Sequence, residues 1–230
     1  MAIAEQYKRT VDQVARQCVA CGRNPAEVQL VAVSKTVGPD GVGQAVAAGA
    51  QVFGENRPDQ ILQKAALFPE SHWHFIGNVQ SRRIPDIVSC ASLIHSVYVA
   101  HHLPKIDAAA REVGKVQRIL LEVNVSGEES KSGAEPGQVP DLIRAAASLE
   151  NISVCGLMTM APQGDLKAAS MCFEGLARLR DELQSNPQLN ADNVELSELS
   201  MGMSEDWREA IAQGATMIRI GRAIFSEDFA

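Results

Sequence analysis

The chain has 230 residues, 46% of them hydrophobic and 4% aromatic, and its 21 lysines and arginines stand against 28 acidic residues, a formal net charge of −7. This composition is typical of a mildly acidic globular protein, and a domain of this length buries about 70% of the surface that its unfolded chain exposes. The acidic balance and the scarcity of aromatic rings argue against nucleic-acid binding, which relies on clustered basic residues and stacking.

Neither a membrane span nor an export signal is visible. No apolar run approaches the roughly 18 residues of a membrane helix, and residues 1–6 lack a basic start followed by an apolar stretch. The five cysteines are odd in number and scattered, so they do not describe a disulfide framework. We expect a cytoplasmic protein with reduced thiols and no membrane association.

The first predicted element is a helix with Tyr7, Val11, Val14 and Cys18 on one face. Eight short apolar or β-branched runs follow, each leading into a stretch with helical periodicity. The runs cover residues 30–33, 52–53, 73–76, 93–95, 119–123, 154–158, 194–199 and 217–220. Strands that are apolar on both faces suit a parallel sheet covered by helices. The alternation predicts one (β/α)8 TIM barrel over residues 1–230, with an extra N-terminal helix; a doubly wound open sheet is the alternative fold.

In such barrels the chemistry lies at the carboxyl ends of the strands, and several of the predicted ends are polar. The first run ends in Ser34-Lys35, the second in Gly54-Glu55-Asn56, the seventh in residues 200–204, and the eighth carries Arg219 and ends in Gly221-Arg222.

Lys35 follows four apolar residues, which predicts an amine at the barrel mouth among apolar neighbours. Desolvation there would lower the pKa of the amine and prepare it to attack a carbonyl. The alternative interpretation is a strand-end lysine that extends to water.

Glycine-containing turns follow the last two strands, where barrels commonly bind phosphate through backbone N–H groups. Ser204 is predicted to cap the next helix, and the two acids after it would repel a phosphate there, so we expect phosphate nearer Ser200, Gly202 and Gly221. Arg219 lies between two isoleucines and needs either a carboxylate or a ligand as partner. A reactive lysine, a phosphate site and an inward arginine together suggest pyridoxal 5′-phosphate.

Motifs along nearly the whole chain support this hypothesis. The segments are Val31-Ala32-Val33-Ser34-Lys35-Thr36, Phe53-Gly54-Glu55-Asn56, Trp73-His74-Phe75-Ile76-Gly77 with Gln80-Ser81, Glu129-Ser130-Lys131-Ser132-Gly133, Gly156-Leu157-Met158, Met201-Gly202-Met203-Ser204, and Arg219-Ile220-Gly221 with Ala223-Ile224-Phe225. With them the sequence resembles the YggS/PROSC family of pyridoxal phosphate homeostasis proteins.

The resemblance implies a barrel like the N-terminal domain of alanine racemase, with Lys35 as the Schiff-base partner of the cofactor. It further implies that Arg219 faces the pyridine nitrogen, that Asn56 lies close to the cofactor, and that the phosphate is surrounded by Ser200, Gly202, Met203, Gly221 and Arg222. Many members of the family have Thr or Ser where this chain has Arg222, and Gly often follows Ala-Ile-Phe where this chain has Ser226.

The expected function is reversible binding that buffers or delivers the cofactor, affecting vitamin B6 and amino-acid balance, without robust catalysis. Racemisation needs a base on each face of the substrate adduct, and in alanine racemase the second base comes from another domain. Neither Tyr7 nor Tyr98 lies at a predicted strand end. A racemase and, more remotely, a cofactor-free class I aldolase are the alternatives. Cofactor-dependent apoenzymes are possible partners, and we expect a monomer because the second racemase domain is absent.

No third candidate ligand stands near the histidines at a spacing typical of metal sites, so we predict no metal site. His74 belongs to a family motif, but its spacing assigns it no role. The polar, glycine-containing loop at 126–137 is predicted to lie over the barrel mouth, and Lys131 within it is a possible secondary cofactor contact.

Overall fold

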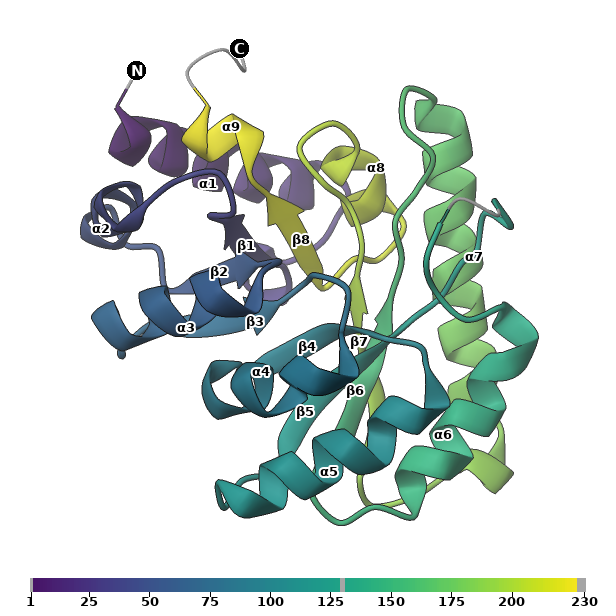
Figure 1. The fold of residues 1–230 in the computed structure, drawn as a ribbon. Coiled ribbons are helices and arrows are strands. Elements are labelled where there is room, and N and C mark those ends of the chain that lie inside the picture. The colour runs from purple at the N-terminus through teal and green to yellow at the C-terminus, as the bar shows by residue number, and fades with distance from the viewer. Residues whose placement is uncertain (1, 129–130, 227–230) are drawn as a thin grey trace.

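The computed structural model describes residues 2–128 and 131–226 and shows a closed barrel of eight parallel strands in the order β1 to β8, with β8 paired back to β1 (Figure 1). The strands are β1 Gln29–Val33, β2 Val52–Glu55, β3 His72–Phe75, β4 Leu93–Val97, β5 Gln117–Glu122, β6 Ile152–Met158, β7 Val194–Ser200 and β8 Met217–Ile220. Each predicted run therefore corresponds to a strand, and the barrel is confirmed over the open sheet.

Helices cover the outside of the barrel (Figure 1). They are α1 Ile3–Ala20, α2 Pro39–Ala47, α3 Pro58–Leu67, α4 Ile84–Cys90, α5 Leu103–Glu112, α6 Val139–Ala147, α7 Leu166–Gln184, α8 Trp207–Ala212 and α9 Arg222–Phe225. Prolines at the first or second position of α2, α3, α4, α5 and α6 suit helix starts, where an N–H would lack a partner anyway.

The extra helix α1 lies beside α9 at one edge of the barrel, and the Gln6 side chain donates to the Ser226 carbonyl at 3.0 Å (Figure 1). Its packed face differs in part from the prediction. Val11 is 40% exposed, whereas the polar residues Gln6 and Thr10 are buried together with Val14 and Cys18. The Thr10 hydroxyl donates to the Gln6 carbonyl one turn earlier, which makes its burial possible.

The core has two parts. Most buried apolar side chains form one continuous cluster between strands and helices, and a small second cluster consists only of strand residues, which fill the barrel interior: Leu93, Leu120, Cys155, Met158 and Met217. Barrel strands thus bury side chains on both faces, which explains their nearly continuous apolar sequence.

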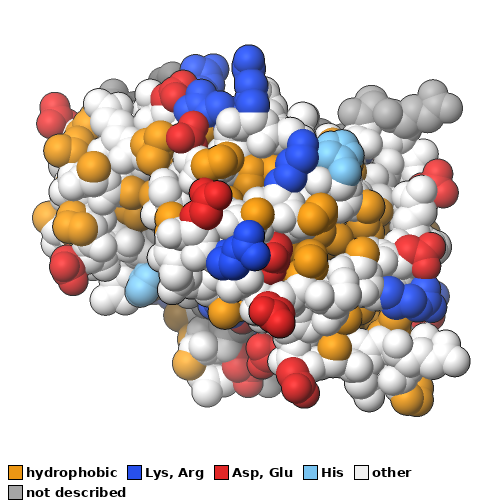
Figure 2. All heavy atoms as spheres, turned by 60° about the horizontal axis from the view of Figure 1, so that its bottom comes forward, with side chains coloured by type: hydrophobic (Ala, Val, Ile, Leu, Met, Phe, Trp, Pro, Cys, Tyr) orange, Lys and Arg blue, Asp and Glu red, His pale blue; other side chains and the backbone are white. Residues whose placement is uncertain are grey.

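The face of the molecule in Figure 2 carries acidic and basic side chains interspersed with hydrophobic ones. It presents no large block of one charge, in agreement with the scattered charges of the sequence. Among the described residues no helix is both long and apolar enough to cross a membrane.

Candidate functional site

A cavity of about 680 Å³ opens at the carboxyl ends of the strands. Its walls come from the ends of β1, β2, β3, β6 and β8 and from the loops after β6 and β7. Six of the predicted site residues line it: Lys35, Asn56, Met203, Arg219, Gly221 and Arg222. Ser200 and Gly202 are not part of the lining; both are buried behind it. Residues that are up to 187 positions apart in sequence, from 35 to 222, therefore meet at one cavity.

Lys35 follows the end of β1 by two residues, at the cavity, but its side chain is exposed. This exposure differs from the desolvated amine that we expected, although apolar residues line the same cavity. Lys35 is positioned by the buried residue before it. The Ser34 hydroxyl donates to Glu55 Oε1 at 2.6 Å, and the Ser34 carbonyl accepts from Lys64 Nζ at 3.0 Å.

Asn56 is held by the close approach of two loops. A Cβ atom at Gly77 would lie 2.1 Å from the Asn56 carbonyl oxygen, so only glycine allows the ends of β2 and β3 to meet here. The Gly77 carbonyl accepts a hydrogen bond from the buried Ser96 hydroxyl on β4. Three consecutive strand ends are thereby linked beneath this side of the cavity.

Arg219 enters the cavity from β8 with its side chain almost fully buried. Its Nη1 donates to Ser200 Oγ at 2.5 Å and its Nη2 donates to the Thr159 carbonyl at 3.0 Å. Desolvation lowers the pKa of the guanidinium to about 10, against the opposing charges of Asp206 and Glu122. No carboxylate of the described residues lies within salt-bridge distance of it. The sequence left either a carboxylate or a ligand as the partner of Arg219, and the geometry favours a ligand.

The turn between β7 and α8 has an unusual backbone. Gly202 has φ +91°, and a Cβ there would lie 2.5 Å from the Ala210 Cβ, so both conformation and packing require glycine. The predicted cap is wrong: α8 begins after Asp206 rather than after Ser204. Asp206 Oδ1 instead accepts the Met203 N–H at 2.6 Å, because the chain makes another turn before the helix starts.

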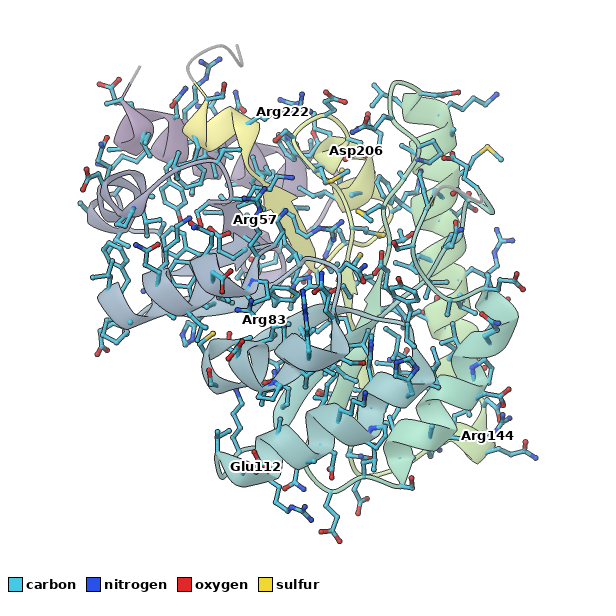
Figure 3. The ribbon with its side chains drawn as sticks, in the orientation of Figure 1. Arg57, Arg83, Glu112, Arg144, Asp206 and Arg222 are labelled. Carbon is cyan, nitrogen blue, oxygen red and sulfur yellow. The ribbon has the colours of Figure 1, made fainter. Side chains whose placement is uncertain are left out.

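This turn presents polar groups to the cavity. The backbone N–H groups of Ser204 and Glu205 have no hydrogen-bond partner within the described part of the chain, and both residues line the cavity. The Glu205 carboxylate accepts from Arg222 Nη2 at 2.6 Å, so its charge is balanced by a guanidinium (Figure 3, where Asp206 and Arg222 are labelled). The repulsion that we expected from Glu205 toward a phosphate is therefore reduced.

Sequence reasoning missed the apolar wall and the loop that completes the cavity. Val33, Ile76 and Met158 form apolar lining, and the loop between β6 and α7 contributes Met160 and residues 162–166. The signal was present, because a short polar segment with Pro and Gly follows the sixth run directly.

The loop at 126–137 was predicted to lie over the mouth, but none of its described residues lines the cavity; residues 129–130 lie outside the described ranges. Lys131 Nζ donates to the Met160 carbonyl at 3.4 Å and pairs with Glu128 at 3.5 Å. The loop therefore contacts the segment that lines the cavity.

Tyr98 also differs from its prediction. It directly follows β4, whose last residue is Val97, and so stands at a strand end after all, because the strand runs two residues beyond the predicted segment. Tyr98 packs against the core and is not part of the cavity wall. Among the described residues no group of three or more His, Cys, Asp or Glu side chains could hold a metal ion.

Comparison with known proteins defines the class of this barrel. The family model described as "Alanine racemase, N-terminal domain" matches residues 11–228. In the present structure the strand ends bring a lysine, an arginine and a glycine-containing turn to one cavity.

Closer relatives identify the family within this class. The pyridoxal phosphate homeostasis protein of Aquifex aeolicus is 36% identical over 99% of this chain and 99% of its own length, and that of Pseudomonas aeruginosa is 38% identical over 97% and 94%. The structure of PipY from Synechococcus elongatus with pyridoxal phosphate bound has a TM-score of 0.77 at 30% identity, covering 93% of this chain and all of PipY. This chain belongs to the family of pyridoxal phosphate homeostasis proteins.

Alanine racemase itself is a more distant neighbour. The Clostridium difficile enzyme has a TM-score of 0.71 at 11% identity, and the match covers 96% of this chain but 61% of the enzyme. This likeness concerns the fold alone.

Proposed function

We propose that this chain binds pyridoxal 5′-phosphate in the cavity and buffers or delivers it to cofactor-dependent apoenzymes, in intracellular vitamin B6 and amino-acid homeostasis. The observation that carries the proposal is that Lys35 and Arg219, from the neighbouring strands β1 and β8, line one cavity together with a turn that offers backbone donors. A volume of about 680 Å³ suits a small-molecule ligand of this size.

The donor groups fit the three functional parts of the cofactor. We infer that Lys35 would hold the cofactor through its side-chain amine, at the position where the cofactor would supply an electrophilic aldehyde carbon. Arg219, as a buried guanidinium that only donates, suits an unprotonated ring nitrogen. Met203, Gly221 and the N–H groups of Ser204 and Glu205 suit the phosphate, with Arg222 at the rim and Asn56 beside the ring.

Ser200 and Gly202 are given indirect roles in this proposal, since both lie behind the lining. Ser200 supports Arg219 through its hydroxyl, and Gly202 lets the phosphate-side turn adopt its backbone conformation. When bound, the cofactor would supply an electrophilic carbon to the lysine and an electron-withdrawing ring.

We further propose that the chain has no robust catalytic turnover. Within the described lining, Lys35 is the sole lysine, and neither a tyrosine nor a histidine stands there as a second base. The lining carboxylates are engaged: Asp165 caps α7, Glu205 pairs with Arg222, and Asp206 accepts the Met203 N–H. An arginine at the ring nitrogen would also weaken the electron sink that stabilises a carbanion.

The experiment is a titration of the purified protein with pyridoxal phosphate, followed by absorption spectroscopy before and after borohydride. Lys105, an exposed lysine of α5 outside the cavity lining, provides the control variant. A visible band that borohydride removes, present in the wild type and in Lys105→Ala but absent in Lys35→Ala, supports the proposal. No band in the wild type would overturn it. Rapid cofactor-dependent racemisation of an amino acid by the loaded wild type would overturn the absence of turnover.

For the assembly we propose a cytoplasmic monomer whose residues 1–230 act as one domain. Gel filtration should then report about 24.7 kDa, the mass of one chain. A mass of twice this value would contradict the monomer.

A further inference from the structure

A chain of hydrogen-bonded side chains runs through the barrel interior behind Arg219. It joins His74 on β3, His95 on β4 and Ser200 at the end of β7 to Arg219 on β8. His74 Nδ1 lies 3.0 Å from His95 Nε2, His95 Nδ1 lies 2.9 Å from Ser200 Oγ, and Ser200 Oγ lies 2.5 Å from Arg219 Nη1. All four side chains are at least 95% buried.

Because these side chains are buried, their hydrogen bonds can run in only one donor-to-acceptor order. A guanidinium only donates, so Ser200 Oγ accepts from Arg219, and the Ser200 hydroxyl hydrogen needs an acceptor of its own. The sole acceptor that the described residues offer it is His95 Nδ1. The proton of neutral His95 is then on Nε2 and is donated to His74 Nδ1, which leaves the proton of His74 on its own Nε2.

The surroundings keep both imidazoles neutral. Burial lowers the pKa of His74 to about 3, and the positive charges of Arg118 and His72 act in the same direction. Burial, His74 and Arg219 hold the pKa of His95 well below its ordinary value. A protonated His95 would also face Ser200 with a donor where the chain requires an acceptor.

We propose that Ser200, His95 and His74 are positioning residues that hold the Arg219 guanidinium toward the cavity, so that Arg219 selects a ligand ring with a hydrogen-bond acceptor. Without an acceptor at His95, the Ser200 hydroxyl is free to turn its hydrogen toward Arg219, and the guanidinium loses one of its two anchors in the barrel. The Thr159 carbonyl is the other anchor. This inference rests on the proposed function for the identity of the ligand.

The hydrogen-bond direction is tested without any ligand, by nitrogen NMR of ¹⁵N-histidine-labelled protein. We expect His95 and His74 to be neutral and protonated at Nε2, with the same signals at pH 6 and pH 8. The signals of the exposed His101 serve as the internal reference for an imidazole in contact with solvent. A proton on Nδ1 of His95, or titration of either buried histidine in this range, would overturn the proposed direction.

The positioning role is tested by two replacements of His95. His95→Asn keeps an acceptor near the position of Nδ1, whereas His95→Leu removes it. The probes are pyridoxal phosphate and its N-methyl derivative, whose ring nitrogen cannot accept a hydrogen bond. We expect the wild type and His95→Asn to prefer pyridoxal phosphate by at least about tenfold, and His95→Leu to lose most of this preference. His101→Leu is the matched control and should keep it.

The outcomes separate this inference from the proposed function. If the wild type and a folded His95→Leu variant prefer pyridoxal phosphate over its N-methyl derivative equally, the positioning role is overturned and cofactor binding stands. If His95→Leu does not fold, two other results still test the inference. They are the histidine tautomers of the wild type and the preference of His95→Asn for pyridoxal phosphate over its N-methyl derivative. Failure of the wild type to bind pyridoxal phosphate would instead overturn the proposed function.

Discussion

The ammonium group of Lys64 is completely buried beneath the site and pairs with Glu55 at 2.5 Å. The Ser34 hydroxyl also donates to Glu55 Oε1, whereas Glu55 Oε2 has no hydrogen-bond partner in the described part of the chain, so Lys64 is the group that balances the buried negative charge. Lys64→Met would leave a buried, unpaired carboxylate, and we expect it to lower the free energy of unfolding by about 3–5 kcal/mol.

Urea denaturation checks this prediction. The control is Arg178→Met, which breaks an exposed ion pair with Glu174 on α7 and should cost about 0–1 kcal/mol. Equal effects of the two substitutions would show that burial does not strengthen the dependence on Lys64.

Glu122, at the end of β5, makes stability depend on pH. Burial raises its pKa from 4.5 to about 7, although the charge of Arg219 opposes this. Because the folded state holds the proton more tightly, the contribution of Glu122 is favourable below about pH 4.5 and is lost as pH rises toward 7. Between these pH values the wild type should lose on the order of 3 kcal/mol of unfolding free energy through Glu122, and Glu122→Gln should not show this loss. The measurement is the free energy of unfolding of both proteins at pH 4.5 and pH 7.5; a constant difference between them would contradict the prediction.

Among the elements, the loops after β2 and β3 approach each other so closely that no side chain fits at Gly77. A methyl group at Gly77 meets the backbone of Asn56, which cannot yield as a flexible side chain would. We expect Gly77→Ala to destabilise the protein by about 1–3 kcal/mol and to weaken cofactor binding by displacing Asn56. Denaturation and a binding titration measure the two effects. Gly137→Ala, with nothing within 4 Å of the added carbon, should change neither.

The strands could be predicted from the sequence, whereas the start of α8 could not. The strands were recognisable because both of their faces are buried, so apolar residues continue without alternation. The start of α8 was misplaced because Ser204 matches a cap by type, whereas Asp206 is fixed by its contact with the Met203 N–H. This contact spans only three residues, so the sequence offered two cap-type residues in one short turn and no signal that chooses between them.

The residues of the site that stand at strand ends could be predicted from the sequence. Lys35 and Arg219 lie at the cavity because topology places the ends of β1 and β8 side by side. The exposure of Lys35 and the burial of Ser200 beneath Arg219 depend on where the chain turns after each strand. The sequence therefore predicted which residues gather, but not which of them line the cavity.

At the scale of the whole molecule, closure of the barrel joins the first and last strands and brings the two ends of the cavity wall together. β1 pairs with β8, and α1 packs against α9 beyond it (Figure 1). The cavity thus depends on the complete ring of strands, and we expect pyridoxal phosphate to raise the melting temperature of the whole domain in a single transition. Calorimetry with and without the cofactor would show this; an unchanged midpoint at saturating cofactor would contradict it.

Lys35 is the residue that we propose holds the cofactor. The most direct measurement is peptide mapping by mass spectrometry after the protein has been loaded with pyridoxal phosphate and reduced with borohydride. We expect the cofactor to be attached to the peptide that contains Lys35, at one equivalent per chain. Attachment at Lys131 or at other lysines, with Lys35 unmodified, would contradict it.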